Sequence, residues 1–242
     1  MKIVSWNVNS IRKGVYDQLL KLANEQSPDV ICFQETKATG HDAEQFFREK
    51  EESDEGLLHL YPYRYWNDGV GGQAGVAIWS KIKPVKITYE VPRIYRLKEG
   101  RIIIAEFENL TLLNTYVPNT GRGEVAEDQR KVWHNAIVAW LTDQFEKDQL
   151  LVWCGDLNVV SEPALDTSHH KVRPKKPIAG LKQFEKDNFD EYIELGLSDA
   201  YRTLYPDTIS YTWFSPRNQG VGWRLDYFLV NDMSKVEDVV HN

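Results

Sequence analysis

The sequence predicts an α/β fold in which strands and helices share one body. Two short apolar runs near the start, 2–7 and 30–34, are separated by a stretch of helical period. From Tyr63 to Phe107 strand signals follow one another without long helices between them. A further apolar run of strand length, 150–158, follows an amphipathic segment. Helices between some strands and strand-to-strand turns between others together indicate mixed sheets.

The N-terminal part is expected to form a strand, a helix and a second strand. Lys2 to Asn7 is the first strand, closed by polar residues through Ser10. A helix follows and ends at Ser27-Pro28; its apolar positions, three and four residues apart, are Tyr16, Leu19, Leu20 and Ala23. The buried strand 30–34 then ends in Glu35-Thr36-Lys37, and the charged stretch 41–55 is expected to be an exposed helix.

The middle of the chain carries five expected strands. Gly- or Pro-bearing turns separate the first four, which we expect to pair antiparallel: 63–66, 75–79, 85–89 and 101–107. The fifth is 110–117, and Pro118-Asn119 stop it before a polar loop that runs through Gly123.

The second half begins with an amphipathic helix and ends with short strands. The apolar stripe of that helix predicts a buried face, made by Val132, Trp133, Ala136, Ile137, Trp140 and Leu141. After the central strand come the basic loop 169–176, a helix over 181–195, and strands at 211–214 and 223–230. Because neither a short internal repeat nor a low-complexity linker interrupts the chain, we expect a single domain over 1–242.

Composition limits the class of protein. The 29 Lys and Arg against 36 Asp and Glu give a net charge of −7, so binding to nucleic acid has to rely on local patches and metal. Cys32 and Cys154 both lie in apolar runs, which predicts reduced buried thiols and an intracellular setting. No signal-peptide core and no run of 18 apolar residues occurs, so we expect no membrane association.

The central stretch Leu150–Asn158 carries the first chemical signal. Asp156 and Asn158 stand one residue apart, and strand alternation directs both toward the same side. A carboxylate and a carboxamide placed in this way suit a hard cation, a phosphate oxygen or a nucleophilic water. Taken alone, Gly-Asp-x-Asn is also a common turn sequence, so the pattern leaves both interpretations open.

Further polar residues follow apolar strands or stand beside aromatic turns, and they are Asn7, Glu35, Tyr116, Asn119 and Asp226. Oxygen donors without a Cys or His cluster favour Mg²⁺ or Mn²⁺ over zinc. Each residue also has a structural alternative: Asn7 as a cap, Glu35 as a surface acid, Tyr116 as a half-buried phenol, and Asp226 as a partner of Arg224 or Arg202. Their joint occurrence favours a site.

Five motifs make the chain similar to the exonuclease III family of apurinic/apyrimidinic (AP) endonucleases, within the DNase I-like endonuclease/exonuclease/phosphatase superfamily. They are Ile3-Val4-Ser5-Trp6-Asn7-Val8-Asn9-Ser10, Gln34-Glu35-Thr36-Lys37, Asn114-Thr115-Tyr116-Val117-Pro118-Asn119, Gly155-Asp156-Leu157-Asn158-Val159 and Gly222-Trp223-Arg224-Leu225-Asp226-Tyr227-Phe228. The resemblance extends to about residue 231. It implies a four-layer α/β/β/α sandwich of two mixed sheets.

The resemblance also implies a function, namely a DNA repair enzyme of base excision repair. Such an enzyme hydrolyses the DNA phosphodiester 5′ to an abasic site with Mg²⁺, for which Mn²⁺ can substitute, and has 3′→5′ exonuclease and 3′-phosphodiesterase activity. It implies double-stranded DNA with abasic sites as partner, a monomer, and a cytoplasmic location, or a nuclear one in a eukaryote.

The matched motifs assign expected roles. Glu35 is the principal metal ligand and Asn7 helps to place the ion, while Asp156 and Asn158 are expected at the water and the metal. The catalytic set is Tyr116, Asp156, Asn158 and Asp226. The substrate-binding set is Asn119, which faces phosphate with Tyr116, then Arg122 at the duplex, and Trp213 and Phe214 as walls for a base-free sugar. Arg122 as a solvated loop cation and the two aromatics as core packing remain alternatives.

The chain departs from the family pattern at its end. Relatives close with a Ser-Asp-His segment whose histidine pairs with the Asp226 equivalent, whereas this chain ends at Val239-Val240-His241-Asn242. We expect His241 to belong to an incoming strand. A chain without the last strand and its Asp/His pair is expected to be weakly active or silent, which leaves a non-catalytic DNA-binding relative as the alternative. A phosphoesterase for inositol phosphates or lipids is a third reading, against which Arg224-Leu225-Asp226-Tyr227 argues.

Overall fold

The computed structural model describes the chain except for residues 13, 52–55, 93–98, 169–177, 217–219 and 242. The described chain falls into two compact units. The first consists of Met1–Val91 and the segment that ends at Tyr116, and the second begins at Val117 and includes the rest of the chain. The basic run 169–176 of the sequence prediction lies outside the described residues.

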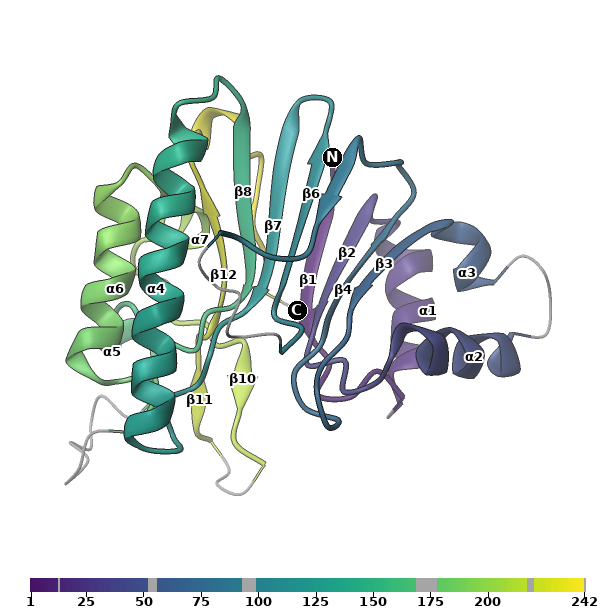
Figure 1. Ribbon diagram of the computed structural model, residues 1–242, viewed down its shortest axis with the longest axis horizontal. Helices are drawn as coiled ribbons and strands as arrows, with labels where there is room; N and C mark the ends of the chain where they lie inside the picture. Colours follow the sequence, from purple (N-terminus) through teal and green to yellow (C-terminus); the bar gives the residue numbers. More distant parts are fainter. Residues whose placement is uncertain (13, 52–55, 93–98, 169–177, 217–219, 242) are drawn as a thin grey trace. The chain divides into compact units, whose positions relative to one another are not determined.

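The first unit contains seven strands and three helices among its described residues (Figure 1). In chain order they are β1 (Ile3–Asn7), α1 (Val15–Gln26), β2 (Val30–Gln34), α2 (Gly40–Lys50), α3 (Leu57–Leu60), β3 (Tyr63–Asn67), β4 (Val76–Ser80), β5 (Lys86–Thr88), β6 (Ile102–Phe107) and β7 (Leu110–Tyr116). All of them except α3, which the sequence analysis did not predict, lie within a few residues of their expected positions, although α2 ends at Lys50.

The first sheet of this unit is mixed, with the strand order β1-β2-β4-β3. Strands β1 and β2 run parallel, with Ile3 opposite Val30, because helix α1 returns the chain to the edge where β1 began. Strand β4 pairs antiparallel with both β2 and β3, and β5, β6 and β7 pair antiparallel in that order. The expected antiparallel middle of the chain is therefore confirmed.

The core of the first unit is organised around Trp79, whose side chain is fully buried. Phe47 of helix α2 packs on its ring edge at 4.9 Å between centroids, and Phe33 and Trp66 lie 5.5 and 5.9 Å away. Edge-to-face aromatic contacts of this kind add to the free energy gained by burying the rings. They fix helix α2 on one face of the first sheet.

Asn114 of β7 connects the two sets of strands in the first unit. Its Oδ1 accepts a 2.7 Å hydrogen bond from Gln34 Nε2, and its Nδ2 donates to the carbonyls of Phe33 and Ala77 at 3.2 and 2.9 Å. Asn114 and Gln34 are both fully buried. Since a buried amide is costly unless it is satisfied, these bonds fix the register of β7 against β2 and β4.

The second unit contains strands and helices in alternation. Its described elements are α4 (Glu124–Phe145), β8 (Leu150–Asp156), α5 (Pro163–Asp166), α6 (Gln183–Glu194), β9 (Ser198–Asp199), α7 (Ala200–Leu204), β10 (Trp213–Phe214), β11 (Gly222–Trp223), β12 (Asp226–Val230) and the 3₁₀ turn η2 (Met233–Lys235).

Strand β12 lies between β8 and β9 and is antiparallel to both. Helices α4 and α6 lie side by side (Figure 1), joined by His134, which contacts the Tyr192 hydroxyl at 3.0 Å and Glu191 at 2.7 Å. The buried stripe of α4 includes Trp133 and Ile137 as expected. Val132 is a correction, since it is 45% exposed and lies outside the stripe.

Two C-terminal expectations are wrong. The expected strand 223–230 is interrupted, because Trp223 belongs to the β10–β11 hairpin and β12 begins only at Asp226. Residues after Lys235 form no strand in the described part, so His241 does not belong to one. The interruption at Arg224 has a physical cause, a buried ion network described below.

The fold class is α/β, with mixed sheets flanked by helices, as the sequence predicts. Both cysteines are free and buried, which was also expected. The single-domain organisation stays a prediction. Within the described residues no helix is long and apolar enough to cross a bilayer.

We predict that Asn114→Ala destabilises the protein by roughly 2–3 kcal/mol, because the buried Gln34 amide loses its 2.7 Å acceptor, the Phe33 and Ala77 carbonyls lose a donor, and a cavity opens. Chemical denaturation followed by tryptophan fluorescence measures this loss. Asn109→Ala, in the exposed turn between β6 and β7, is the control and should change the free energy of unfolding by less than about 0.5 kcal/mol. Equal stability of both variants would contradict the role given to Asn114.

Candidate active site

The first unit places two predicted metal ligands together. Asn7, at the end of β1, donates its Nδ2 to Glu35 Oε1 at 2.9 Å. Lys37 forms an ion pair of 2.7 Å with the other carboxylate oxygen of Glu35 and also contacts the Asn9 side chain. The Glu35 side chain is only 18% exposed, so one carboxylate, one amide and one ammonium group share a half-buried position.

The loops after β1 and β2 are bound to each other through their backbones. The amides of Val8, Ser10 and Ile11 donate to the carbonyls of Gln34, Glu35 and Thr36 at 3.0, 2.8 and 3.0 Å. Glu35 itself has a positive φ of 52°, which is unfavourable for a residue with a side chain. The parallel pairing of β1 and β2 thus brings Asn7 and Glu35 to one end, and the loop bonds hold them there.

The donor chemistry around Glu35 fits a magnesium ion. Mg²⁺ prefers oxygen ligands, retains several waters and needs few protein ligands. Glu35 and Asn7 offer hard oxygen donors and remain partly accessible to solvent. No group of three or more His, Cys, Asp or Glu able to hold a metal occurs in the described part of the chain, so a protein-enclosed zinc site is not found there.

Tyr116 lies at the end of β7 and is half-buried. The Arg101 guanidinium lies 4.8 Å from the centre of its ring, and the Arg101 Nη1 donates to the Tyr116 carbonyl at 3.2 Å. Arg101 is in turn paired with Glu99 at 2.7 Å. The cation over the ring fixes the phenol at the strand end, which is the position that the sequence assigns to it.

The second unit brings Asp156 and Asp226 together. They are directly opposite each other in the antiparallel pair β8–β12. Residues opposite one another in such a pair project to the same face of the sheet, with Cβ atoms roughly 5 Å apart. Two carboxylates in this arrangement repel each other, and their position at a strand end makes both candidates for acid–base chemistry.

Asn158 joins the two acids to the loop after β7. Its backbone amide donates to Asp156 Oδ1 at 2.8 Å, and its side-chain Nδ2 donates to the Val117 carbonyl at 2.8 Å. Its Oδ1 accepts a 2.9 Å bond from Asn119 Nδ2. Asp156 and Asn158 are each only 5% exposed, whereas Asn119 is exposed. Three predicted site residues therefore form one hydrogen-bonded series.

The β10–β11 hairpin exposes the predicted aromatic pair. Trp213 is 40% exposed and Phe214 65% exposed, so core packing does not account for Phe214. Trp213 lies edge to face with Trp223 at 6.1 Å between centroids. Gly222 is required there because a Cβ at this residue would come within 2.4 Å of the Tyr211 ring. Arg122 lies exposed in the loop before α4.

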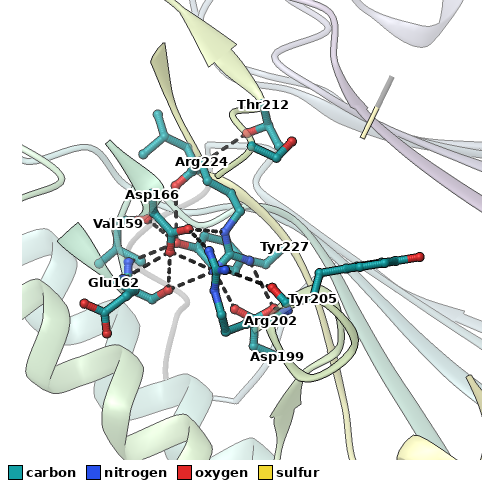
Figure 2. A network of polar contacts seen from close by, with 12 residues as sticks. Val159, Glu162, Asp166, Asp199, Arg202, Tyr205, Thr212, Arg224 and Tyr227 are labelled. Carbon is teal, nitrogen blue, oxygen red and sulfur yellow. Dashed lines mark hydrogen bonds and ion pairs between the residues drawn. The ribbon is translucent and has the colours of Figure 1, made fainter. Parts of the chain in front are cut away.

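A buried ion network supports the segment between β11 and β12 (Figure 2). Arg224 donates to Asp166 from Nε at 2.9 Å and from Nη2 at 2.8 Å, and to Asp199 from Nη1 and Nη2 at 3.0 and 2.7 Å. Arg202 approaches Asp166 from the other side. Thr212 Oγ1 accepts from the amides of Leu225 and Asp226. Asp226 is thus fixed through its backbone.

Charge within this network shifts several pKa values. Burial alone would raise the pKa of Asp166, but hydrogen bonds from Arg224 and Ser161 and the charges of both arginines hold it below its usual range. Burial and the positive charge of Arg224 lower the pKa of His241 to about 4. His241 stacks on Tyr201 at 3.9 Å and contacts Ser210 Oγ at 2.8 Å.

Sequence reasoning missed several residues of the site. Lys37 was detectable, since it stands two residues after Glu35 in the same motif. The expected alternative that Asp226 pairs with Arg224 or Arg202 is replaced, because the carboxylate partners of both arginines are Asp166 and Asp199. No local pattern marks these two acids. Asn7, Glu35 and Tyr116 lie in the first unit, and the other predicted site residues lie in the second.

An α/β body whose strands end in carboxylate and amide side chains is typical of phosphoesterases that use a hard metal ion. The chain belongs to the Endonuclease/Exonuclease/phosphatase family, whose model matches residues 4–242. The family predicted from the five sequence motifs is confirmed, and with it the expectation of a nuclease-type enzyme.

Named relatives agree with this class. The chain is 37% identical over 238 residues to the DNA repair nuclease APEX1 of Danio rerio, covering 96% of this chain and 73% of that protein. It is 33% identical over 250 aligned positions to the exodeoxyribonuclease of Bacillus subtilis (strain 168), covering 98% and 92%. An AP endonuclease structure from Archaeoglobus fulgidus superposes with a TM-score of 0.78 at 27% identity, covering 96% and 86%.

We predict that Arg224→Met lowers the free energy of unfolding by roughly 3–5 kcal/mol and the Tm by roughly 10 °C, because Asp166 and Asp199 keep buried charges without their main partner. Thermal unfolding followed by circular dichroism measures the change. Arg48→Met removes an exposed ion pair with Glu44 and should shift the Tm by less than about 2 °C. Similar Tm shifts for the two variants would argue against a structural role for the network.

Proposed function

We propose that this chain is a Mg²⁺-dependent DNA repair nuclease that hydrolyses the phosphodiester 5′ to an abasic site. We propose 3′→5′ exonuclease and 3′-phosphodiesterase activity at the same site. One observation carries the proposal: Asp156 and Asp226 form a cross-strand acid pair, and Asn158 links it to the exposed Asn119. The names of the relatives, a DNA repair nuclease and an exodeoxyribonuclease, support the substrate class.

In this proposal each side chain has a separate task. Asp156 takes the proton of the attacking water, and the hydrogen bond from the Asn158 amide to its Oδ1 orients the carboxylate for this task. The Asn158 amide positions the nucleophile and the phosphoryl oxygen. Asn119 and Tyr116 contact the non-reacting phosphate oxygens. Preorganised donors of this kind stabilise the charge that develops on the phosphate in the transition state.

The metal in the proposal is held mainly by Glu35, with help from Asn7. Their half-buried oxygen donors fit Mg²⁺, and Mn²⁺ is the expected substitute. When bound, the ion neutralises phosphate charge and stabilises the leaving oxygen. Lys37 pairs with the Glu35 carboxylate at 2.7 Å and balances part of its charge. Asp156 and Asn158 are kept as candidate ligands.

Recognition of the lesion is assigned to exposed residues of the second unit. Trp213 and Phe214 present aromatic surface that can pack on a base-free sugar, a group small enough to leave the duplex at low cost. Arg122 contacts duplex phosphate. Because the net charge is −7, affinity rests on such local contacts and should fall steeply with salt. We also propose a monomer, and an intracellular location, which the two free thiols favour.

We predict that the chain nicks a labelled duplex with one tetrahydrofuran site in Mg²⁺ at the weak rate expected from its sequence, and that Asp156→Asn and Glu35→Gln each lower this rate at least about 100-fold. Gel analysis of 5′-labelled strands gives rate and cleavage position. Asp187→Asn and Glu108→Gln, exposed acids with the same chemical change, should retain the parent rate.

Four results would count against the proposal, two against the activity and two against its specificity. Binding of the abasic duplex by the parent chain without any nicking would identify a non-catalytic DNA-binding relative. Hydrolysis of inositol phosphates or lipid head groups without action on the duplex would identify a phosphoesterase of another branch. Cleavage 3′ to the lesion, or on undamaged duplex at an equal rate, would contradict the assigned specificity.

We also predict that EDTA reduces nicking to background and that added Mg²⁺, or Mn²⁺, restores it, because a neutralising ion on the phosphate is worth several kcal/mol. Zn²⁺ should restore much less, since the donors are oxygen atoms. Initial rates across a series of metal concentrations measure this. Full activity in EDTA would disprove metal dependence.

A further inference from the structure

The loop between β7 and α4, which carries Asn119 and Arg122, is bound to the interior of the second unit by buried side chains. Thr120 Oγ1 donates a 2.6 Å hydrogen bond to Glu185 Oε1, and Arg130 Nη1 donates to the Pro118 carbonyl at 3.0 Å. Thr120, Arg130 and Glu185 are each 1% exposed or less. None of the three faces solvent, so none of them meets nucleic acid directly.

Glu185 connects this loop to the start of helix α6. Its Oε2 accepts from the backbone amides of Gly180 and Lys182 at 2.7 and 3.0 Å. The Lys182 ammonium returns to the loop, where it contacts the Thr120 carbonyl at 3.1 Å and pairs with Glu127 at 2.7 Å. The carboxylate of Glu185 is therefore satisfied on both oxygens and has a fixed orientation.

Arg130 is a buried cation of helix α4 that lies within electrostatic reach of Glu185. Burial lowers the pKa of its guanidinium, and the nearby negative charges of Glu185 and Asp156 oppose that effect. A buried charge of this kind seldom adds net stability, because desolvation costs about as much as the pairing returns. Its contribution is to the position of the loop. The Val117 carbonyl accepts a hydrogen bond from Asn158 and the Pro118 carbonyl accepts one from Arg130, so two consecutive residues of the loop are held in place.

We propose that Arg130, Glu185 and Thr120 are positioning residues that hold the Val117–Gly121 loop so that the Asn119 amide meets Asn158 and a substrate phosphate in reactive geometry. The inference rests on the proposed function, whose site it deepens. Asn119 itself is exposed, and its bond to Asn158 Oδ1 is 2.9 Å, so a shift of the loop moves both amides. Displacement of a contact by about 1 Å can lower a rate about 100-fold.

The test compares Thr120→Val, which deletes only the hydroxyl donor, with Thr120→Ser, which retains it. We expect kcat on the tetrahydrofuran duplex to fall about tenfold in Thr120→Val with KM changed less than threefold, because the lost alignment acts on the transition state. Thr120→Ser should return to within about twofold of the parent. Thr142→Val, the same change at an exposed residue of α4 whose hydroxyl bonds its own helix, should leave kcat unchanged.

Arg130→Met is the stronger variant, with an expected fall in kcat of about 100-fold. Hydrogen exchange of the 117–121 peptide provides a readout that does not depend on cleavage, and it should become faster in both Thr120→Val and Arg130→Met. Unchanged exchange in Thr120→Val would overturn the inference, as would faster exchange with unchanged kcat.

Failure of the proposed function gives a different pattern. If the parent chain does not nick the duplex, the proposed nuclease function is wrong. The positioning role is then tested by hydrogen exchange of the 117–121 peptide together with the affinity for the same duplex, measured by fluorescence anisotropy. Faster exchange with weaker binding in Thr120→Val, restored in Thr120→Ser, supports the positioning role. Faster exchange with unchanged affinity refutes it.

Discussion

Arg224 lies with its guanidinium fully buried between Asp166 and Asp199, and the position of β12 depends on it (Figure 2). Its backbone amide donates to the Asp166 carbonyl at 2.8 Å, so the residue separates β11, which ends at Trp223, from β12, which begins at Asp226. Because the Arg224 guanidinium is removed from water, its N–H donors need acceptors within the protein. The positions of Asp166 and Asp199 therefore fix the conformation of the turn. The register of β12 against β8 follows from that turn.

This register determines which side chains meet. Asp226 lies opposite Asp156, and a shift of β12 by one residue would direct it to the other face of the sheet. Two neighbouring carboxylates destabilise the pair of strands, so the buried arginine and the Thr212 hydroxyl, which fixes the Asp226 amide at 3.1 Å, offset a cost that the site imposes. The interactions of Arg224 and Thr212 thus offset the repulsion between Asp156 and Asp226.

Local sequence was sufficient for the features whose cause is local. The run Ile3–Asn7 was expected to be a strand because it begins with two β-branched residues and continues with Trp6, and Glu35 was expected at a strand end because it follows the apolar run 30–34. The same reasoning failed for Val132, since helical period alone does not fix where the buried stripe of α4 ends. It failed at Arg224 because the partners Asp166 and Asp199 are 58 and 25 residues away, and no pattern in the sequence reports such pairs. Glu185 and Arg130 were missed for the same reason.

Backbone conformation is unusual at both Glu35 and Asn158. Both have positive φ values, 52° and 49°, a region that costs residues with a Cβ about 1–3 kcal/mol and that asparagine tolerates better than glutamate. Glycine would remove this cost at either position, so the side chains are retained in spite of the backbone. Neighbouring bonds hold each of them, from the Ser10 amide to the Glu35 carbonyl at 2.8 Å and from the Asn158 amide to Asp156 at 2.8 Å. The strained backbone and the bond beside it therefore give the Glu35 carboxylate and the Asn158 amide a fixed direction.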